Sequence, residues 1–369
     1  MIYADYNATA PLRPEARAAM MEAMADPGNP SSVHGPGRRA RAALEEGRRR
    51  VAKLLGAEPE TVTFTSGGTE ADLLALRGAG RTRVLVSAIE HEAVLAAVPD
   101  AERIPVGSNG LIDLTALEAL LDASDVPAIV SVMWANNETG AIQPLAEVVA
   151  LARHHGALVH SDAVQAVGKV PVNFQESGID LLSVSAHKIG GPAGIGALVC
   201  RAGLALEPQI AGGGQERGRR SGTENLLGII GFGAAALRAL VELEGDALPT
   251  RIAELRDRLE ARVLASAPLA RVLCRDVPRL PNTSSIVLPG VRAETQVMAL
   301  ELEGIAVSAG SACSSGKVKR SHVVEAMEPG GEAAAETIRV SFGWLSTEDD
   351  VDRLADAWLR LYKRAGREV

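Results

Sequence analysis

Residues 157–200 read ALVHSDAVQAVGKVPVNFQESGIDLLSVSAHKIGGPAGIGALVC, and this stretch decides the fold class. It holds three short apolar runs, 157–161, 180–185 and 195–200, whose length and Val, Leu and Ile content are typical of buried strands. Asp162 closes the first run, and Lys188 follows the second. Because open α/β sheets bind ligands at the carboxyl ends of their strands, both side chains are candidate site residues.

Three further strand patterns precede this stretch, at 61–65, 83–87 and 128–133. Helical patterns begin between them, near Thr69, His91 and Pro144. Alternation of strands and helices at this spacing predicts an α/β fold with a mostly parallel sheet, covered by helices on both faces.

The pattern changes after about residue 224. Long helical stretches at 223–244 and 250–265 lead into a compact α+β segment. That segment comprises strand 284–288, helix 294–303, strand 305–308, strand 337–342 and helix 348–363. We predict a large domain over 13–245 and a smaller α+β domain built from 1–12 and 246–369.

Composition excludes several classes of protein. The 369 residues are 47% hydrophobic and 23% charged, as in globular proteins. A net charge of −8 argues against a nucleic-acid binder. The longest apolar stretch, 226–237, is too short to span a membrane, and the first residues do not resemble a signal peptide. Three widely spaced cysteines without a CxxC pair argue against disulfides and structural zinc, so we expect no metal and a cytoplasmic location.

Lys188 and Asp162 together suggest a chemistry. A lysine directly after an apolar strand is desolvated, which lowers its pKa and makes its amine nucleophilic. A buried carboxylate can pair with a ring nitrogen. Pyridoxal phosphate (PLP) enzymes use this combination, with the lysine forming a Schiff base. Taken alone, Asp162 is more typical of a helix N-cap.

Other motifs leave two interpretations open. Residues 66–70, SGGTE, follow a strand and open a helix, which suits an anion site or a capped turn. His91 could stack on a flat cofactor, move protons or only start a helix. The paired Asn136 and Asn137 suit a turn or a ligand contact. Arg339, inside a strand, needs a partner, either an ion pair or a substrate carboxylate.

Two loops complete the candidates. Residues 212–223, GGGQERGRRSGT, suit a mobile surface loop, a phosphate contact or a subunit seam. Cys313 lies in the small-residue stretch SACSSG, before Lys317, Lys319 and Arg320, and a basic setting favours its thiolate. Cys200, at the end of an apolar strand, is expected to be inert core.

Taken together, these segments resemble the NifS/IscS-type cysteine desulfurases, class V aminotransferases with the fold-type I PLP architecture. The resemblance rests on motifs spread in order along the chain: YADYNATAPL (3–12), GNPSSVHG (28–35), TSGGTEADL (65–73), EHEAVL (90–95), ANNETGAIQP (135–144), HSDAVQAVGK (160–169), SAHKIGGP (185–192), GGGQERGRRSGTEN (212–225), SAGSACSSG (308–316) and IRVSFG (338–343).

The resemblance implies a role for each matching residue. Lys188 would carry PLP, Asp162 would pair with the ring nitrogen, Gln165 with the ring hydroxyl, and His91 would stack on the ring. The resemblance also implies that the cofactor phosphate is held by Gly68, Thr69, Ser185 and His187. In a homodimer, Thr223 would contact the phosphate of the other subunit's cofactor. Asn137 and Arg339 would bind the substrate carboxylate, and Asn29 would line the entrance.

The implied reaction converts L-cysteine to L-alanine. Lys188 would remove the Cα proton, and Cys313, in a small-domain segment at about 308–320, would take the sulfur as a persulfide. The sulfur would pass to an acceptor protein, by default for iron–sulfur cluster assembly. The sequence departs from many relatives in three places: Trp344 replaces an arginine, the chain stops at Val369, and the loop after Cys313 reads GKVKR, which is more basic than in many relatives.

Three alternatives remain at this stage. A selenocysteine lyase or another class V aminotransferase-like enzyme could work without Cys313. A nucleotide-binding module would need a GxGxxG after its first strand, whereas the turn here is SGGTE. A non-catalytic sulfur-transfer protein with this fold would have no use for Lys188.

Overall fold

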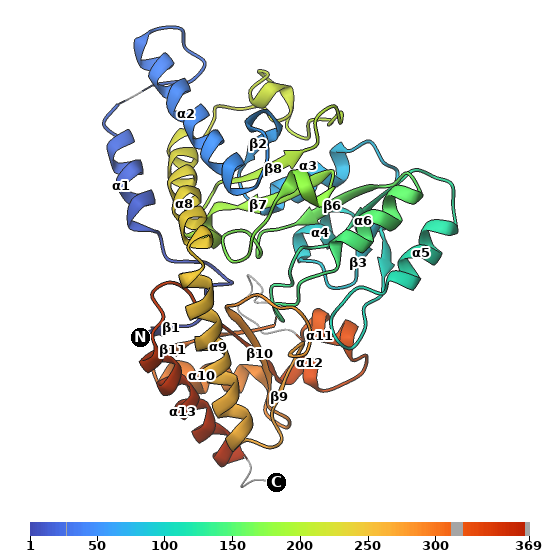
Figure 1. Ribbon diagram of the computed structural model, residues 1–369, viewed down its shortest axis with the longest axis vertical. Coiled ribbons are helices and arrows are strands. Elements are labelled where there is room, and N and C mark those ends of the chain that lie inside the picture. Colours follow the sequence, from blue (N-terminus) through green and yellow to red (C-terminus); the bar gives the residue numbers. More distant parts are fainter. Residues whose placement is uncertain (27, 311–319, 366–369) are drawn as a thin grey trace.

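A computed structural model describes residues 1–26, 28–310 and 320–365 (Figure 1). Its largest sheet has seven strands in the order β2-β8-β7-β6-β5-β3-β4. Their bounds are β2 (Val62–Thr65), β3 (Arg83–Ser87), β4 (Glu102–Ile104), β5 (Ala128–Ser131), β6 (Leu158–Asp162), β7 (Leu181–Ser185) and β8 (Gly196–Cys200). Strands β4, β3, β5, β6 and β7 are mutually parallel, so the predicted mostly parallel sheet is confirmed.

Strand β8 runs antiparallel to both of its neighbours, β7 and β2. The alternation pattern did not predict this reversal. Only the short 3₁₀ helix η2 (Ala186–Ile189) and a Gly-rich turn lie between β7 and β8. A parallel return needs a crossover of a dozen or more residues, so this short connection reverses the chain direction.

Helices cover both faces of the large sheet, as predicted. Those around it are α1 (Pro14–Ala23), α2 (Gly35–Leu54), α3 (Gly68–Gly78), α4 (Glu92–Ala97), α5 (Leu114–Asp122), α6 (Leu145–His154), α7 (Phe174–Ser177) and α8 (Leu226–Glu244), with the 3₁₀ turns η1 (Pro59–Thr61) and η3 (Glu216–Gly218). Successive strand residues enter opposite cores. Ile129 and Leu158 join the core with α3 and α4, whereas Val130 and Val159 join the core with α2, α5, α6 and α8.

Helix α8 is long and apolar enough by composition to cross a membrane, and half of its apolar window is buried inside the protein. It packs closely against α2. A Cβ on Gly233 would lie 2.8 Å from the Cα of Gly47, so neither position accepts a side chain without moving the helices apart. Burial against neighbouring helices accounts for the apolar composition of α8.

A second sheet lies at the other end of the molecule, reached along α8 and α9 (Ala247–Ser266) (Figure 1). Its order is β12-β13-β10-β9, all antiparallel, and a parallel pair β1-β11 lies beside it. The elements are β1 (Ile2–Tyr3), β9 (Arg271–Val272), β10 (Thr283–Val287), β11 (Ile305–Ala306), β12 (Ser308–Ala309), β13 (Thr337–Ser341), α10 (Ala293–Leu302), α11 (His322–Met327), α12 (Ala333–Glu336) and α13 (Glu348–Ala365).

This second sheet has its own apolar core, which includes Ile2, Ile286, Val340 and Trp358. The N-terminal residues Ile2 and Ala4 therefore pack with the C-terminal part of the chain. The exact domain boundaries stay a prediction. One predicted element is corrected: strand 305–308 is two short strands, because the chain leaves β1 after Ala306 and pairs with β13 from Ser308.

Candidate active site

The carboxyl ends of the parallel strands surround a cavity of about 210 Å³. Nine of the residues singled out from the sequence line it: Gly68, Thr69, His91, Asn137, Asp162, Gln165, Ser185, His187 and Lys188. Parallel strands end at the same sheet edge, so segments far apart in the sequence converge there. Asp72 and Met133 also line the cavity, and neither was a sequence candidate.

One end of the cavity is suited to an anion. Helix α3 starts there at Gly68, and Gly67 provides no side-chain cap. The first N–H groups of a helix have no intrahelical partner and carry partial positive charge. A Cβ on Gly68 would lie 2.9 Å from Val164 Cγ2, so the turn has room for little more than glycine. Ser185 lines the same cavity and adds a hydroxyl.

Asp162 ends β6 and is buried, with 7% of its surface exposed. Its Oδ1 accepts a hydrogen bond of 2.8 Å from the Val164 N–H. Burial raises the pKa of Asp162, while His91 and Lys188 oppose the rise. A cationic group placed against this carboxyl would favour its ionised form.

Lys188 lies in η2, directly after β7. Its Nζ donates hydrogen bonds to the main-chain oxygens of Asn7 (2.6 Å) and Ala8 (2.8 Å). Burial, and next the charge of Arg339, lower the pKa of Lys188 to about 8, while the charge of Asp162 opposes this shift. A substantial fraction of this amine is therefore neutral, and hence nucleophilic, near neutral pH.

His91 is the N-cap of α4, and its Nδ1 accepts a hydrogen bond of 3.1 Å from the Ala93 N–H. In the neutral ring the proton therefore lies on Nε2. The ring also lines the cavity, so the helix-start and cavity interpretations of His91 are both consistent with the geometry.

Asn7 is a contact that the sequence reasoning missed. Gln165 Nε2 donates to the Asn7 main-chain oxygen (3.0 Å), and Lys169 Nζ donates to Asn7 Oδ1 (3.0 Å) and Gln165 Oε1 (2.6 Å). These contacts fix which way the Gln165 amide faces. Burial lowers the pKa of Lys169, and the charge of Lys188 adds to this shift. The sequence signal that could have drawn attention to Asn7 is its place in the motif YADYNATAPL (3–12).

Asn136 and Asn137 have different surroundings. Asn136 is buried, and its Oδ1 accepts hydrogen bonds from the N–H groups of Glu138 and Thr139, as a turn-forming Asn does. Asn137 lines the cavity, and its main-chain oxygen accepts a hydrogen bond from Arg339.

Arg339 lies on β13 and is buried. It forms an ion pair with Asp5 at 2.7 Å, which is the structural pair weighed from the sequence. Arg339 does not line the 210 Å³ cavity, although Nη1 reaches the Asn137 oxygen at its edge (3.1 Å). Its Nε has no partner among the described residues. A contact with a substrate carboxylate therefore stays a prediction.

Two other candidates, Thr223 and Asn29, lie away from this cavity. Thr223 is exposed and lines a different cavity of about 100 Å³, with Ser66 and Arg220. Asn29 is exposed, and its Oδ1 accepts from the Ser31 N–H in a local turn. Within one chain the structure brings neither residue to Lys188. Cys313 lies outside the described residues.

Cys200 and Cys274 are both buried, and burial raises the pKa of both thiols. A raised pKa disfavours the reactive thiolate at neutral pH. This agrees with the expectation that Cys200 is core, and it disfavours both cysteines as nucleophiles.

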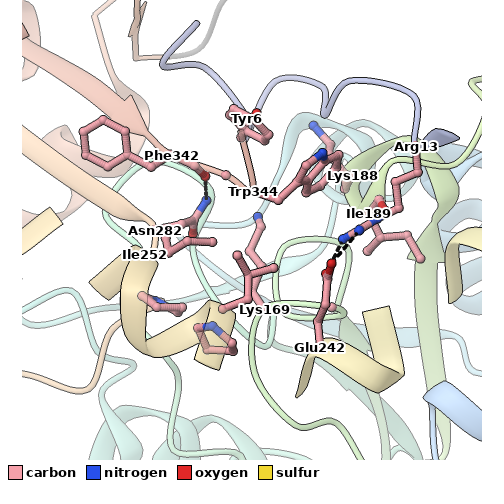
Figure 2. Close-up of a pocket in the computed structure, with 15 residues that line it drawn as sticks. Tyr6, Arg13, Lys169, Lys188, Ile189, Glu242, Ile252, Asn282, Phe342 and Trp344 are labelled. Carbon is pink, nitrogen blue, oxygen red and sulfur yellow. Dashed lines mark hydrogen bonds and ion pairs between the residues drawn. The ribbon is translucent and has the colours of Figure 1, made fainter. Parts of the chain in front are cut away.

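A second cavity, of about 40 Å³, also has Lys188 in its lining (Figure 2). Figure 2 shows Arg13 between Trp344 and Glu242 at its rim. The Arg13 guanidinium lies 3.9 Å from the Trp344 ring centre and forms two hydrogen bonds with the Glu242 carboxylate. Arg13 Nε also donates to the Ile189 oxygen (2.8 Å), beside Lys188. The Trp344 ring thus packs against the guanidinium of Arg13, which comes from the N-terminal part of the chain.

Comparisons with known proteins agree with this geometry. The family model described as aminotransferase class-V matches residues 2–354. A cysteine desulfurase of Cereibacter sphaeroides is 47% identical, over 96% of this chain and 94% of its own length. The cysteine desulfurase NifS of Azotobacter vinelandii is 42% identical, over 96% and 90%. The structure of a NifS-like protein from Rickettsia africae superposes with a TM-score of 0.92 at 35% identity, covering 98% of this chain and 99% of that one.

The family match spans nearly the whole chain, and the large sheet carries Lys188, Asp162 and His91 at one edge. The IscS of Dictyoglomus turgidum, 38% identical over 98% of this chain, extends the same likeness. The chain therefore belongs to the class V aminotransferase family, in the group that contains NifS and IscS.

Proposed function

We propose that this protein is a PLP-dependent cysteine desulfurase, which converts L-cysteine to L-alanine and transfers the sulfur to Cys313. One observation carries the proposal: Lys188, Asp162 and His91 line a single cavity in a chain whose relatives are named cysteine desulfurases. A structure described as SspA in complex with cysteine is a further relative, with a TM-score of 0.80 and 27% identity.

The residues around the cavity suit PLP. The free N–H groups at the start of α3, with Ser185 and His187, suit its phosphate. The buried Asp162 suits its ring nitrogen, and Lys188 would hold it covalently. Burial lowers the pKa of His187 to about 4, so His187 would act there as a neutral hydrogen-bonding group. When bound, PLP supplies a ring that draws electrons away from the Cα of an amino acid.

The chain itself would bind the substrate and move its protons. Lys188 Nζ, with its pKa of about 8, would accept the Cα proton of the substrate. His91 Nε2 carries the proton of the neutral ring, and we assign it a hydrogen bond to the sulfur of the substrate. Asn137 and Arg339 are the proposed contacts of the substrate carboxylate.

Sulfur transfer requires a thiolate. Cys313 would attack the substrate sulfur, so that an S–S bond forms, the C–S bond breaks, and alanine leaves once carbon is reprotonated. Among the three cysteines, burial disfavours Cys200 and Cys274. The products are L-alanine and a Cys313 persulfide, which balances the atoms of L-cysteine and one protein thiol.

The proposal includes three further elements. The protein acts as a cytoplasmic homodimer, in which Thr223 contacts the cofactor phosphate of the other subunit and Asn29 lies at the entrance. An acceptor protein takes the sulfur, for iron–sulfur cluster assembly or another sulfur-containing product. The exposure of Thr223 and Asn29 on the single chain supports an arrangement between subunits.

An absorption spectrum tests the cofactor. The purified protein should show a band at the edge of the visible range that shifts when L-cysteine is added. Lys188→Ala should abolish the band, whereas Lys53→Ala, on the exposed end of α2, should keep it. A protein that stays colourless after addition of PLP would refute the proposed cofactor.

A second experiment tests the persulfide. Cys313→Ala should lose release of sulfide from L-cysteine while it keeps the absorption band. Turnover unaffected by this substitution would exclude sulfur transfer through Cys313 and favour the alternative, a selenocysteine lyase or a related class V enzyme.

A further inference from the structure

Asp72 is a second buried carboxyl in the active-site cavity, on α3. Only 1% of its surface is exposed, and its Oδ1 has no hydrogen-bond partner among the described residues. The nearest basic group is His160, whose Nε2 lies 3.6 Å from Asp72 Oδ1. A buried carboxyl with an unpaired oxygen is costly if ionised, so its charge state needs an explanation.

His160 does not neutralise Asp72. Burial lowers the pKa of His160 to about 3, so the ring is uncharged at neutral pH. Its two nitrogens also have other partners, the hydroxyls of Ser131 (2.8 Å) and Ser183 (2.9 Å). The 3.6 Å approach to Asp72 is therefore not a salt bridge.

The other titratable groups near Asp72 do not provide a partner either. On its own helix, Glu70 pairs with Arg220, and Arg77 donates to the Ala97 oxygen. The titratable groups on the neighbouring elements are Asp162 on β6, Glu90 after β3, His91 at α4, Lys188 and His187 in η2, and Cys200 on β8. None of the cations among them lies within 4.0 Å of the Asp72 carboxylate.

Two carboxyls that share a buried cavity do not both ionise, because each disfavours the charge of the other. Hydrogen bonds decide which of them keeps the proton. Asp162 accepts the Val164 N–H, which favours its charged form. The Ser183 hydroxyl opposes the rise in the pKa of Asp72, but Asp72 Oδ1 has no hydrogen-bond partner among the described residues. Burial, and then the charge of Asp162, raise the pKa of Asp72 well above its usual value.

We propose that Asp72 keeps a proton in the native protein and acts as a positioning residue, so that Asp162 alone carries the negative charge of this cavity. The role of that charge rests on the proposed function, in which Asp162 faces the cofactor ring. The inference that Asp72 keeps a proton does not depend on the proposed function. An ionised Asp72 would raise the pKa of Asp162. It would therefore disfavour the ionised form of Asp162, which is the form that pairs with a cationic ring nitrogen.

Infrared spectroscopy of the full-length purified protein tests the proton directly. At neutral pH the wild type should show the carbonyl band of a protonated carboxyl, and Asp72→Asn and Asp72→Leu should both lose part of it. Asp26→Asn is the matched control, because it removes an exposed carboxylate whose pKa is lowered by Arg39 and should leave this band in place. No loss in either Asp72 variant would overturn the proposal.

Stability against pH is a second readout that a purely structural role would not change. The native pKa of Asp72 is raised, so unfolding releases a proton above about pH 4, and the wild type loses stability as the pH rises. Asp72→Asn lacks this loss. The melting temperature of Asp72→Asn minus that of the wild type should increase by roughly 2 °C or more from pH 4 to pH 8. The size of this difference at pH 4 itself does not matter.

Asp26→Asn is the control for this measurement, because the pKa of the exposed Asp26 is lowered by Arg39, and the relative melting temperature should not increase. A relative melting temperature of Asp72→Asn that falls between pH 4 and pH 8 would mean that Asp72 is ionised. The infrared band and the melting temperature depend neither on the absorption band of the cofactor nor on cysteine turnover. The absorption band and the turnover of the wild type therefore test the proposed function separately.

Discussion

Lys188 and Lys169 bind opposite sides of one residue: Lys188 Nζ donates to the main-chain oxygen of Asn7 (2.6 Å), and Lys169 Nζ donates to its side-chain oxygen (3.0 Å). Asn7 also reaches the second sheet, because Asn7 Nδ2 donates to Thr283 Oγ1 (2.9 Å) and Asn282 Nδ2 donates to Asn7 Oδ1 (2.9 Å). The segment before α1 thus joins the active-site lysine to the C-terminal part of the chain.

Substitution of Asn7 by alanine should therefore destabilise the protein. Asn7 is 1% exposed, and its removal takes one hydrogen bond each from Lys169, Asn282 and Thr283. Each lost hydrogen bond contributes about 0.5–1.5 kcal/mol, and we expect a total loss of roughly 2–4 kcal/mol in the free energy of unfolding. Urea unfolding measures it. Asn109→Ala, in an exposed turn, is the control, and an equal loss there would contradict this role of Asn7.

The active-site residues that end strands could be predicted from the sequence. Asp162, Lys188 and His91 each follow an apolar run, and the rule that parallel strands end at one edge places them together. Asn7 could not be found this way, because its partners lie 130 to 334 residues away in the chain. Local patterns contain no information on such contacts.

The same limit explains the other differences. The sequence indicated that Arg339 needs a partner, but Asp5 is 334 residues away. Residues 305–308 have the pattern of one strand, and only the positions of β1 and β13 divide it into two. Asp72 has the spacing of an ordinary buried helix position, so its carboxyl gave no signal before the cavity was known.

The pKa of Lys188 predicts how cofactor uptake depends on pH. Only the neutral amine reacts with an aldehyde, and burial lowers this pKa to about 8. After removal of the cofactor, the rate of PLP uptake should rise about tenfold per pH unit up to about pH 8 and then level off. Stopped-flow absorbance measures this rate. A rise that continues to the usual lysine value near 10.4 would contradict the lowered pKa.

Arg339 and Asp5 should shift this profile in opposite directions. The charge of Arg339 lowers the pKa of Lys188, and the charge of Asp5 raises it. Arg339→Gln should therefore move the plateau of PLP uptake to higher pH, and Asp5→Asn should move it to lower pH. The double variant should lie between them. Uptake contains no amino-acid substrate, so the comparison is independent of any contact with a substrate carboxylate. Shifts in the same direction would contradict the electrostatic origin.

The buried ion pair between Arg13 and Glu242, in the lining of the same 40 Å³ cavity as Lys188, should contribute far more to the free energy of unfolding than the exposed pair between Arg238 and Glu242. Arg13 and Glu242 are 4% and 10% exposed, whereas Arg238, which contacts the same Glu242, is 46% exposed. Glu242→Gln leaves Arg13 buried without a counter-charge and should cost roughly 3–5 kcal/mol. Arg238→Ala removes an exposed pair and should cost about 0–1 kcal/mol. Urea unfolding of both variants measures the difference. Similar losses would mean that Trp344 and the Ile189 oxygen hold Arg13 without help from Glu242.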